Sequence, residues 1–220
     1  MEILQDIDFK NINRGMQANE TFSLPFDIEQ IERALNNAYY AEVIKRNRSY
    51  NTDSEIFDKA HRIAKWLTNK QSRPGLLLYG KVGTGKTTFL NAVCRVINFC
   101  CKAEPNERTL HDSKRVISMI RAKDIVEAWQ NDKDYFNRMC NVPLLAVDEF
   151  GIEAIDVKSY GNTNEPIIDM LSSRYDRQRT TIISSNLDME GIKERYGERL
   201  QDRFNEMFTT ISFNGQSFRN

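Results

Sequence analysis

The 220-residue chain has no apolar stretch near the roughly 18 residues that a membrane-spanning helix requires. Its N-terminus, Met-Glu-Ile-Leu-Gln-Asp, lacks the basic start and apolar core of a secretory signal peptide. Internal repeats and low-complexity tracts are also absent. Hydrophobic residues make up 40% and charged residues 28%, which is typical of a soluble protein with a full core. We therefore expect a cytoplasmic protein of one domain plus an extension.

Cysteine and histidine are too few and too scattered for a usual metal site. The chain has no Cys-x-x-Cys pair, and zinc sites are normally built from such closely spaced ligands. We expect reduced cysteines that serve packing, with Cys94 on the core-facing side of a helix. The residues concerned are Cys94, Cys100, Cys101, Cys140, His61 and His111.

An excess of positive charge is missing as well, because 31 basic residues balance 31 acidic ones. Proteins that rely on non-specific attraction to the nucleic-acid backbone are usually basic. Any contact with DNA must therefore be local and assisted by assembly.

The most specific pattern present is the octet Gly-Lys-Val-Gly-Thr-Gly-Lys-Thr at 80–87, which fits the phosphate-binding pattern G-x-x-x-x-G-K-[ST]. A short apolar run at 76–79 predicts a buried strand before it, and apolar residues at helical spacing follow it. Glycines let the backbone point its N–H groups at phosphate oxygens, and the new helix adds its positive N-terminal end. A glycine-rich turn that matches by chance is the alternative. The residues expected to bind a nucleoside triphosphate are Gly80, Lys81, Val82, Gly83, Thr84, Gly85, Lys86, Thr87 and Thr88.

Within this loop, Lys86 is expected to reach the β- and γ-phosphates and the Thr87 hydroxyl to bind Mg²⁺. A second apolar run, 144–147, ends in Asp148 and Glu149 and is typical of a strand buried on both faces. Asp148 would hold Mg²⁺ through water. Glu149 points to the other side of the strand and would activate a water for attack on the γ-phosphate. The pair favours hydrolysis, since binding alone needs no second carboxylate; the alternative is a surface acidic pair.

The run Thr-Thr-Ile-Ile-Ser-Ser-Asn at 180–186 predicts a β-branched strand that ends in small polar residues. The Asn186 amide would hydrogen-bond both the γ-phosphate and the attacking water. Ser-Ser-Asn alone is ordinary turn chemistry. The Ser-Ser-Asn motif is informative because of its place in the chain: the phosphate loop, the acidic strand and the strand with a polar end follow one another as in additional-strand P-loop ATPases.

Five further motifs accompany the loop: Val147-Asp148-Glu149-Phe150-Gly151, Ser173-Arg174-Tyr175, Ser184-Ser185-Asn186, Tyr196-Gly197-Glu198-Arg199-Leu200 with Asp202-Arg203-Phe204, and Phe213-Asn214-Gly215-Gln216-Ser217-Phe218-Arg219. With these motifs, residues 75–220 resemble the AAA+ ATPases of the DnaC/IstB type, the bacterial helicase loaders and transposition helpers. The last three motifs discriminate best. A Gly-Glu-Arg-x-x-x-Arg helix followed by a Phe-x-Gly-x-Ser-x-Arg tail is a much more specific sequence signal than a phosphate loop.

By this resemblance, Arg203 would be the arginine finger that reaches the nucleotide of a neighbouring subunit, with Arg199 as the fallback one turn earlier. Arginine suits this task because its planar guanidinium stays charged and contacts two phosphate oxygens at once. The alternative is that both arginines form surface ion pairs on an acidic helix. Because only seven residues follow Phe213, we expect no helical lid domain of the kind that many AAA+ proteins have, which fits the DnaC/IstB branch.

The resemblance also implies a channel for single-stranded DNA, lined by an extra helix in the segment 124–138. Its residues 124–129 predict a helix, and aromatic and basic side chains interleave along the segment, as bases and phosphates require. The alternative is that Trp129 and Phe136 belong to the core. The side chains concerned are Trp129, Lys133, Tyr135, Phe136 and Arg138.

The region before the loop predicts an amphipathic helix at 27–46 capped by Asp27, a polar linker at 47–54 and a second helix at 55–67. In the resembled loaders, the region before the ATPase core grips the replicative helicase. Here it is short and matches no loader N-terminal domain, which leaves the protein partner open.

We therefore expect a P-loop NTPase of the α/β class: a three-layer αβα sandwich with an AAA+ core at 55–220 and a helical extension at 1–54, which is the candidate partner-binding segment. Its five parallel strands are expected at 76–79, 116–120, 144–147, 181–184 and 210–213.

The favoured function is that of a Mg²⁺-dependent, ATP-hydrolysing, DnaC-like replication factor. Its subunits would assemble through nucleotide-bridged interfaces around single-stranded DNA and load or remodel a replicative DNA helicase. The alternative is an IstB-like helper ATPase that acts with a transposase. A nucleotide-dependent binding switch with negligible turnover is a third interpretation.

Overall fold

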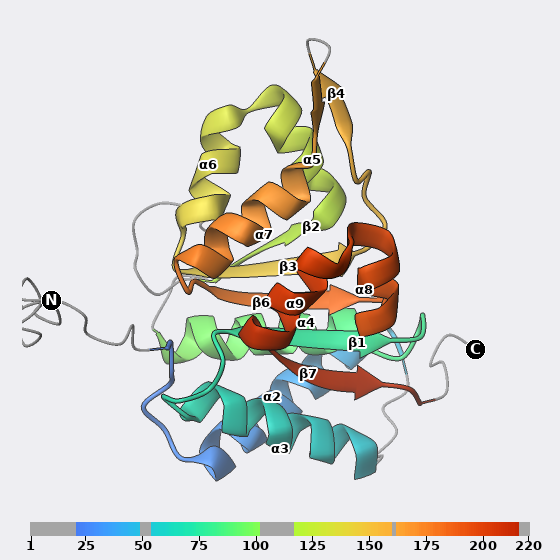
Figure 1. Ribbon diagram of the computed structural model, residues 1–220. Coiled ribbons are helices and arrows are strands. Elements are labelled where there is room, and N and C mark those ends of the chain that lie inside the picture. The colour runs from blue at the N-terminus through green and yellow to red at the C-terminus, as the bar shows by residue number, and fades with distance from the viewer. Residues whose placement is uncertain (1–20, 49–53, 102–116, 160–161, 216–220) are drawn as a thin grey trace, which may run out of the picture.

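The computed structural model describes residues 21–48, 54–101, 117–159 and 162–215. Its centre is a five-stranded, wholly parallel sheet with the strand order β2-β3-β6-β1-β7 (Figure 1). This confirms the predicted α/β sandwich. The strands are β1 (Gly75–Gly80), β2 (Ser118–Arg121), β3 (Leu144–Phe150), β6 (Thr180–Ser185) and β7 (Phe208–Phe213).

The central strands are apolar on both faces, as the hydrophobic runs predicted. In β1, Leu76 and Leu78 belong to one hydrophobic cluster and Leu77 to the other, because successive side chains point to opposite faces. Residue Val116, at the predicted start of the second strand, lies outside the described residues. Each of the other four predicted strands is two or three residues longer in the structure than predicted.

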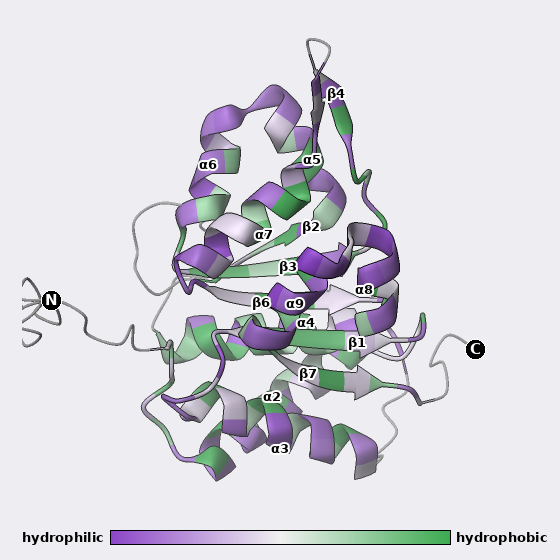
Figure 2. Cartoon of the chain, in the orientation of Figure 1, coloured by the Kyte–Doolittle hydropathy of each residue, from purple (hydrophilic) through white to green (hydrophobic). Residues whose placement is uncertain are grey.

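Helices cover both faces of the sheet, so that neither apolar face meets water (Figures 1 and 2). One cluster joins the sheet to α2 (Ile28–Lys45), α3 (Ser54–Thr68) and α4 (Lys86–Cys100). The other joins it to α5 (Ala122–Asn131), α6 (Lys133–Asn141), α7 (Pro166–Asp176), α8 (Met189–Tyr196) and α9 (Glu198–Met207). On α4, Cys94 is buried as predicted, and burial raises the pKa of its thiol to about 12.

Helix α2 begins where the sequence predicted. The N–H of Asp27 donates to Gln30 Oε1 at 3.2 Å, which is one half of a capping box. The helix packs against α4, where the rings of Tyr39 and Phe89 lie 4.3 Å apart.

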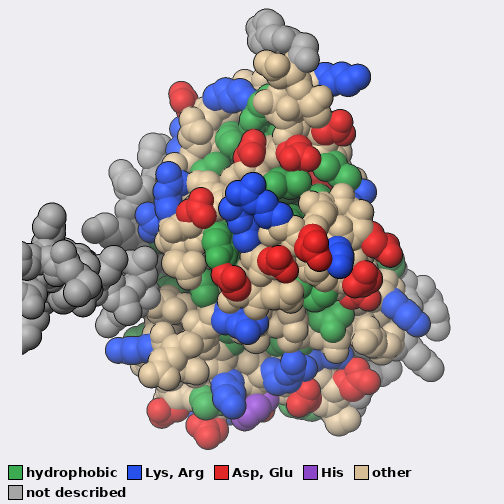
Figure 3. Space-filling view, in the orientation of Figure 1, with side chains coloured by type: hydrophobic (Ala, Val, Ile, Leu, Met, Phe, Trp, Pro, Cys, Tyr) green, Lys and Arg blue, Asp and Glu red, His purple; other side chains and the backbone are tan. Residues whose placement is uncertain are grey.

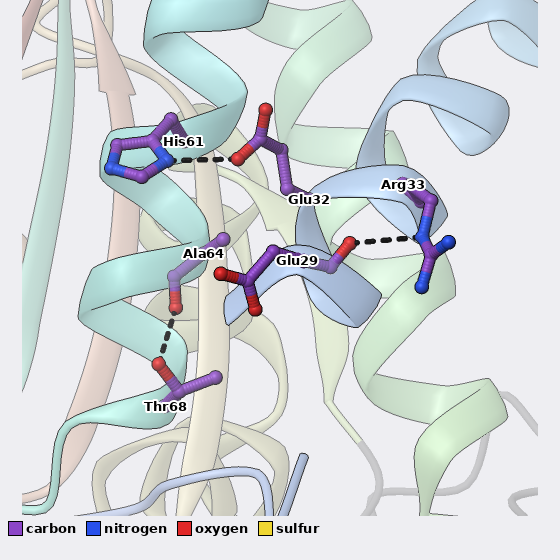
Figure 4. Close-up of polar contacts among 6 residues, drawn as sticks. All are labelled: Glu29, Glu32, Arg33, His61, Ala64 and Thr68. Carbon is purple, nitrogen blue, oxygen red and sulfur yellow. Dashed lines mark hydrogen bonds and ion pairs between the residues drawn. The ribbon is translucent and has the colours of Figure 1, made fainter. Parts of the chain in front are cut away.

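Helix α2 also contacts α3. Figure 4 shows the ring of His61 on α3 beside Glu32 on α2, with Nδ1 and Oε2 2.8 Å apart. The described part of the region before residue 55 thus packs on the α/β core itself. The division at residue 54 stays a prediction, and most of the predicted linker at 47–54 lies outside the described residues.

The fully buried Arg174 braces α6 and α7 against the start of β6. Its guanidinium donates to the carbonyl oxygens of Met139, Val142 and Thr180 and to Thr181 Oγ1, at 2.7–2.8 Å. Burial lowers its pKa to about 9, so the group stays charged at neutral pH. The four acceptors compensate for burying this charge.

Some elements were not predicted. Helix α6 follows α5 after a single residue, and a hairpin of β4 (Val157–Ser159) and β5 (Asn162–Asn164) extends beyond the sheet after β3 (Figure 1). Within the described ranges, no helix has both the length and the apolar character needed to cross a membrane.

Candidate nucleotide site

The predicted phosphate loop leaves β1 at the carboxyl edge of the sheet and ends at the first turn of α4. Gly80 has a φ of 143°, and a Cβ there would collide with the carbonyl oxygen of Phe213 on the neighbouring strand β7. Glycine is therefore required at the point where the loop departs. Gly85 is the N-cap residue of α4, so that the unpaired N–H groups of its first turn face the loop.

The ammonium group of Lys86 lies inside this loop. Its Nζ donates to the carbonyl oxygens of Gly80 and Lys81 at 2.7 and 2.6 Å, and only 7% of the residue is exposed. The loop backbone thus holds the charge at the position from which it can meet phosphate oxygens.

The two predicted metal-binding residues are brought together across 61 positions of sequence. Thr87 Oγ1 donates to Asp148 Oδ1 at 3.0 Å, and Asp148 is 5% exposed. Ser184 Oγ, from β6, donates to the same carboxylate oxygen. A carboxylate beside hydroxyl oxygens is a donor set that suits Mg²⁺.

Glu149 departs from a regular strand. Its φ is 59°, and the pairing of β3 with β6 shifts register between Val147 and Phe150. The Glu149 N–H donates to Ser184 Oγ at 3.1 Å, which fixes the turn. The prediction assumed a regular pleat, whereas this left-handed residue is turned so that its exposed side chain lines the loop's cleft.

The cleft gathers predicted and unpredicted residues. Asn186 lines it at the end of β6, beside Ser184 and Ser185. Arg46 and Arg48, from the end of α2, also line it and were not predicted as site residues. The signal for them was the basic run Lys-Arg-Asn-Arg at 45–48, but nothing in the sequence places that run beside a loop more than 30 residues away. The full lining is Arg46, Arg48, Val82, Gly83, Gly85, Lys86, Thr87, Thr88, Glu149, Ser184, Ser185 and Asn186.

Comparison with protein-family models identifies the family of this chain. A family model described as the bacterial DnaA ATPase domain matches residues 50–210. The chain belongs to this family. The predicted AAA+ resemblance is thereby confirmed, whereas comparison with curated protein sequences gives no match.

Solved structures of related proteins have the fold of this DnaA-type ATPase domain. The DnaC helicase loader superposes with a TM-score of 0.57 at 18% identity, over 80% of this chain and 98% of that chain. A putative primosome component from Streptococcus pyogenes serotype M3 gives a TM-score of 0.57 at 15% identity, over 90% and 93%. AMPPCP-bound DnaA from Aquifex aeolicus gives a TM-score of 0.51 at 19% identity, over 77% of this chain and 50% of that chain. At these identities the likeness shows a shared fold.

In this DnaA-type domain, neither candidate finger is among the residues that line the cleft. Both lie on α9, where Arg199 is exposed and the guanidinium carbon of Arg203 lies 5.2 Å from the centre of the Tyr175 ring. Figure 3 shows acidic side chains gathered over α8 and α9. The ion pairs found among the described residues include neither arginine; on these helices Lys193 pairs with Glu198 at 3.3 Å.

The segment 124–138 of the domain lies in α5, which contains the helix predicted at 124–129, and in the unpredicted helix α6. Phe136 is 7% exposed within a hydrophobic cluster, so for this residue the core alternative is right. Trp129 is only partly buried, and Lys133 Nζ lies 3.0 Å from its ring centre. Arg138 lies 5.5 Å from the ring of Tyr135. Two aromatic and basic pairs are thus found on α5 and α6.

Proposed function

We propose that this DnaA-type domain binds ATP with Mg²⁺ in the cleft and hydrolyses it. The observation that carries the proposal is the contact between Thr87 and Asp148, which joins the phosphate loop to the acidic strand. Glu149 and Asn186 line the same cleft. The family match and the AMPPCP-bound DnaA of similar fold support nucleotide as the ligand.

Each side chain has a defined task in this proposal. Lys86 presents a compact positive charge to the outer phosphates, and Thr87 and Asp148 supply oxygen ligands for the cation. When bound, Mg²⁺ neutralises charge on the phosphate oxygens. Glu149 accepts the proton of the attacking water, and the Asn186 amide orients that water against the γ-phosphate.

Lys86→Ala protein should lose tight nucleotide binding, because a charge-assisted contact to phosphate contributes about 1.5–3 kcal/mol. Titration with a fluorescent ATP analogue should show an affinity at least about tenfold weaker than that of the wild type. Lys65→Ala, which removes an exposed charge on α3, is the matched control and should bind as the wild type does. Unchanged affinity in Lys86→Ala protein would overturn the assignment of the loop.

We further propose that subunits assemble with α9 of one against the nucleotide of the next, and that the assembly loads or remodels a replicative DNA helicase. The absence of Arg199 and Arg203 from their own subunit's cleft supports action in trans. The structures of similar fold include a DnaC helicase loader and a putative primosome component, which favours the helicase as partner. In this proposal residues 1–54 contain the partner-binding segment.

Single-stranded DNA would contact the exposed sides of α5 and α6. Trp129 with Lys133 and Tyr135 with Arg138 combine a ring for stacking with a charge for phosphate. The face in Figure 3 carries interspersed charges of both signs, consistent with a contact that is local.

The proposals for the helicase and for single-stranded DNA can be tested together by co-elution in size-exclusion chromatography. With ATP, the wild-type chain should co-elute with the host's replicative helicase, and an oligothymidylate should join the complex. Lys86→Ala protein should do neither, because assembly depends on nucleotide. Co-elution that is equal with and without ATP would contradict the nucleotide-bridged assembly, and no co-elution at all would exclude the helicase as partner.

A further inference from the structure

The arginines at the end of α2 are part of the cleft although they lie outside the recognised phosphate loop. Arg46 Nη1 donates to Thr88 Oγ1 at 2.7 Å, and Thr88 lies in the first turn of α4. Arg48 lines the same cleft. The contact therefore joins two segments 42 positions apart, directly beside the phosphate loop.

The turn that ends α2 fixes the positions of both arginines. Asn47 has a left-handed φ of 52°, its N–H donates to Ile44 O at 2.9 Å, and the Arg48 N–H bonds Val43 O at 3.4 Å. These two bonds make a Schellman turn with asparagine at the left-handed position. Both side chains therefore project from an ordered helix end rather than from an open loop.

The Arg46 guanidinium takes part in none of the ion pairs found among the described residues. The nearest carboxylate along the helix face is Glu42, one turn earlier, but Glu42 pairs with Arg95 at 3.5 Å. No carboxylate among the described residues forms an ion pair with Arg46. A guanidinium has five N–H donors, and the bond to Thr88 uses one nitrogen, so further donors remain for an anion in the cleft.

The two threonines of the loop face different partners. Thr87 meets Asp148, at the end where the outer phosphate and cation are proposed to bind, whereas Thr88 meets Arg46. Arg46 and Asp148 therefore contact two different residues of this turn.

We propose that Arg46 and Arg48 are phosphate ligands which α2 delivers to the nucleotide, and that Arg46 contacts the inner phosphates shared by ADP and ATP. This inference rests on the proposed nucleotide site and extends it to the helix before the recognised core. In this arrangement the bound nucleotide contacts the end of α2 directly, so that nucleotide binding restrains that end of the helix. The competing explanation is that these side chains only neutralise the negative end of the α2 dipole.

The test compares three variants that each remove one positive charge from the same helix end. Arg46→Ala should weaken ADP and ATP binding by the same factor, about 10- to 100-fold, as expected for a lost charge-assisted bond. Arg48→Ala should act in the same direction by a smaller factor. Lys45→Ala, whose exposed side chain does not line the cleft, should stay within about twofold of the wild type. Circular dichroism without nucleotide checks that each variant is folded.

Hydrogen–deuterium exchange provides a second readout that does not depend on affinity. At saturating ADP, backbone amides of residues 43–48 should exchange more slowly in the wild type, and this protection should be absent in Arg46→Ala protein. Protection at 80–88 should persist in both, because the loop still holds the nucleotide.

Three outcomes would overturn the inference: wild-type affinity in Arg46→Ala protein, an equal loss in Lys45→Ala protein, or a loss confined to ATP. Any of these, together with weakened binding in Lys86→Ala protein, would leave the nucleotide site itself standing. Failure of the wild type to bind either nucleotide would instead reject the proposed function.

Discussion

Arg203→Ala protein should bind ATP with wild-type affinity and hydrolyse it about 10³- to 10⁵-fold more slowly, the usual effect of removing an arginine finger. Binding should survive because Arg203 does not line the cleft of its own subunit. Mixing this variant with Lys86→Ala protein should restore activity. Some mixed interfaces then pair an intact phosphate loop with an intact Arg203, and phosphate release measures the rescue.

Arg199 is more exposed than Arg203 and lies one turn earlier on α9. The same binding, hydrolysis and mixing measurements on Arg199→Ala protein show which of the two arginines is the finger. Lys193→Ala is the matched control because it removes a partly exposed charge that pairs with Glu198. Wild-type activity should also rise faster than linearly with protein concentration. Linear dependence and no rescue in either mixture would make both arginines structural surface residues.

Glu149→Gln should keep ATP binding and slow hydrolysis by about 10²- to 10⁴-fold, because the amide preserves size and hydrogen bonding but cannot accept the proton. Asp148→Asn should instead raise the Mg²⁺ concentration required, since Asp148 is the carboxylate that meets Thr87. Single-turnover phosphate release and a Mg²⁺ titration separate the two effects. An equal loss of ATP binding in both variants would refute this division of labour.

Glu149→Gly separates the chemical role of this side chain from its backbone. The left-handed φ of 59° is strained for glutamate and relaxed for glycine, so thermal stability should not fall while hydrolysis is lost. A marked drop in melting temperature would show instead that the side chain stabilises the fold.

Local patterns were sufficient for the sheet and for most of the proposed site. Continuous apolar runs such as 144–147 are typical of strands covered on both sides, and the helices predicted at 27–46 and 55–67 follow from periodicity and the Asp27 cap. The conformation of the loop at 80–87 could be predicted because its glycines and the helix that follows are contiguous in sequence. The hairpin of β4 and β5 was missed because the polar residues that form it are also typical of a loop.

Short stretches of the amino-acid sequence were enough to propose the chemical groups of the site: a phosphate loop, a carboxylate pair at the end of a buried strand, and a polar strand end after it. Each of these depends on neighbouring residues, which a local pattern records. Tertiary packing alone decided that Ser184 fixes the Asp148–Glu149 turn and that Arg174 braces β6. It also brought Arg46 to Thr88, because the burial of α2 against α4 sets where that helix ends. Contacts between distant segments follow from how apolar faces pack together, and no short pattern in the chain encodes them.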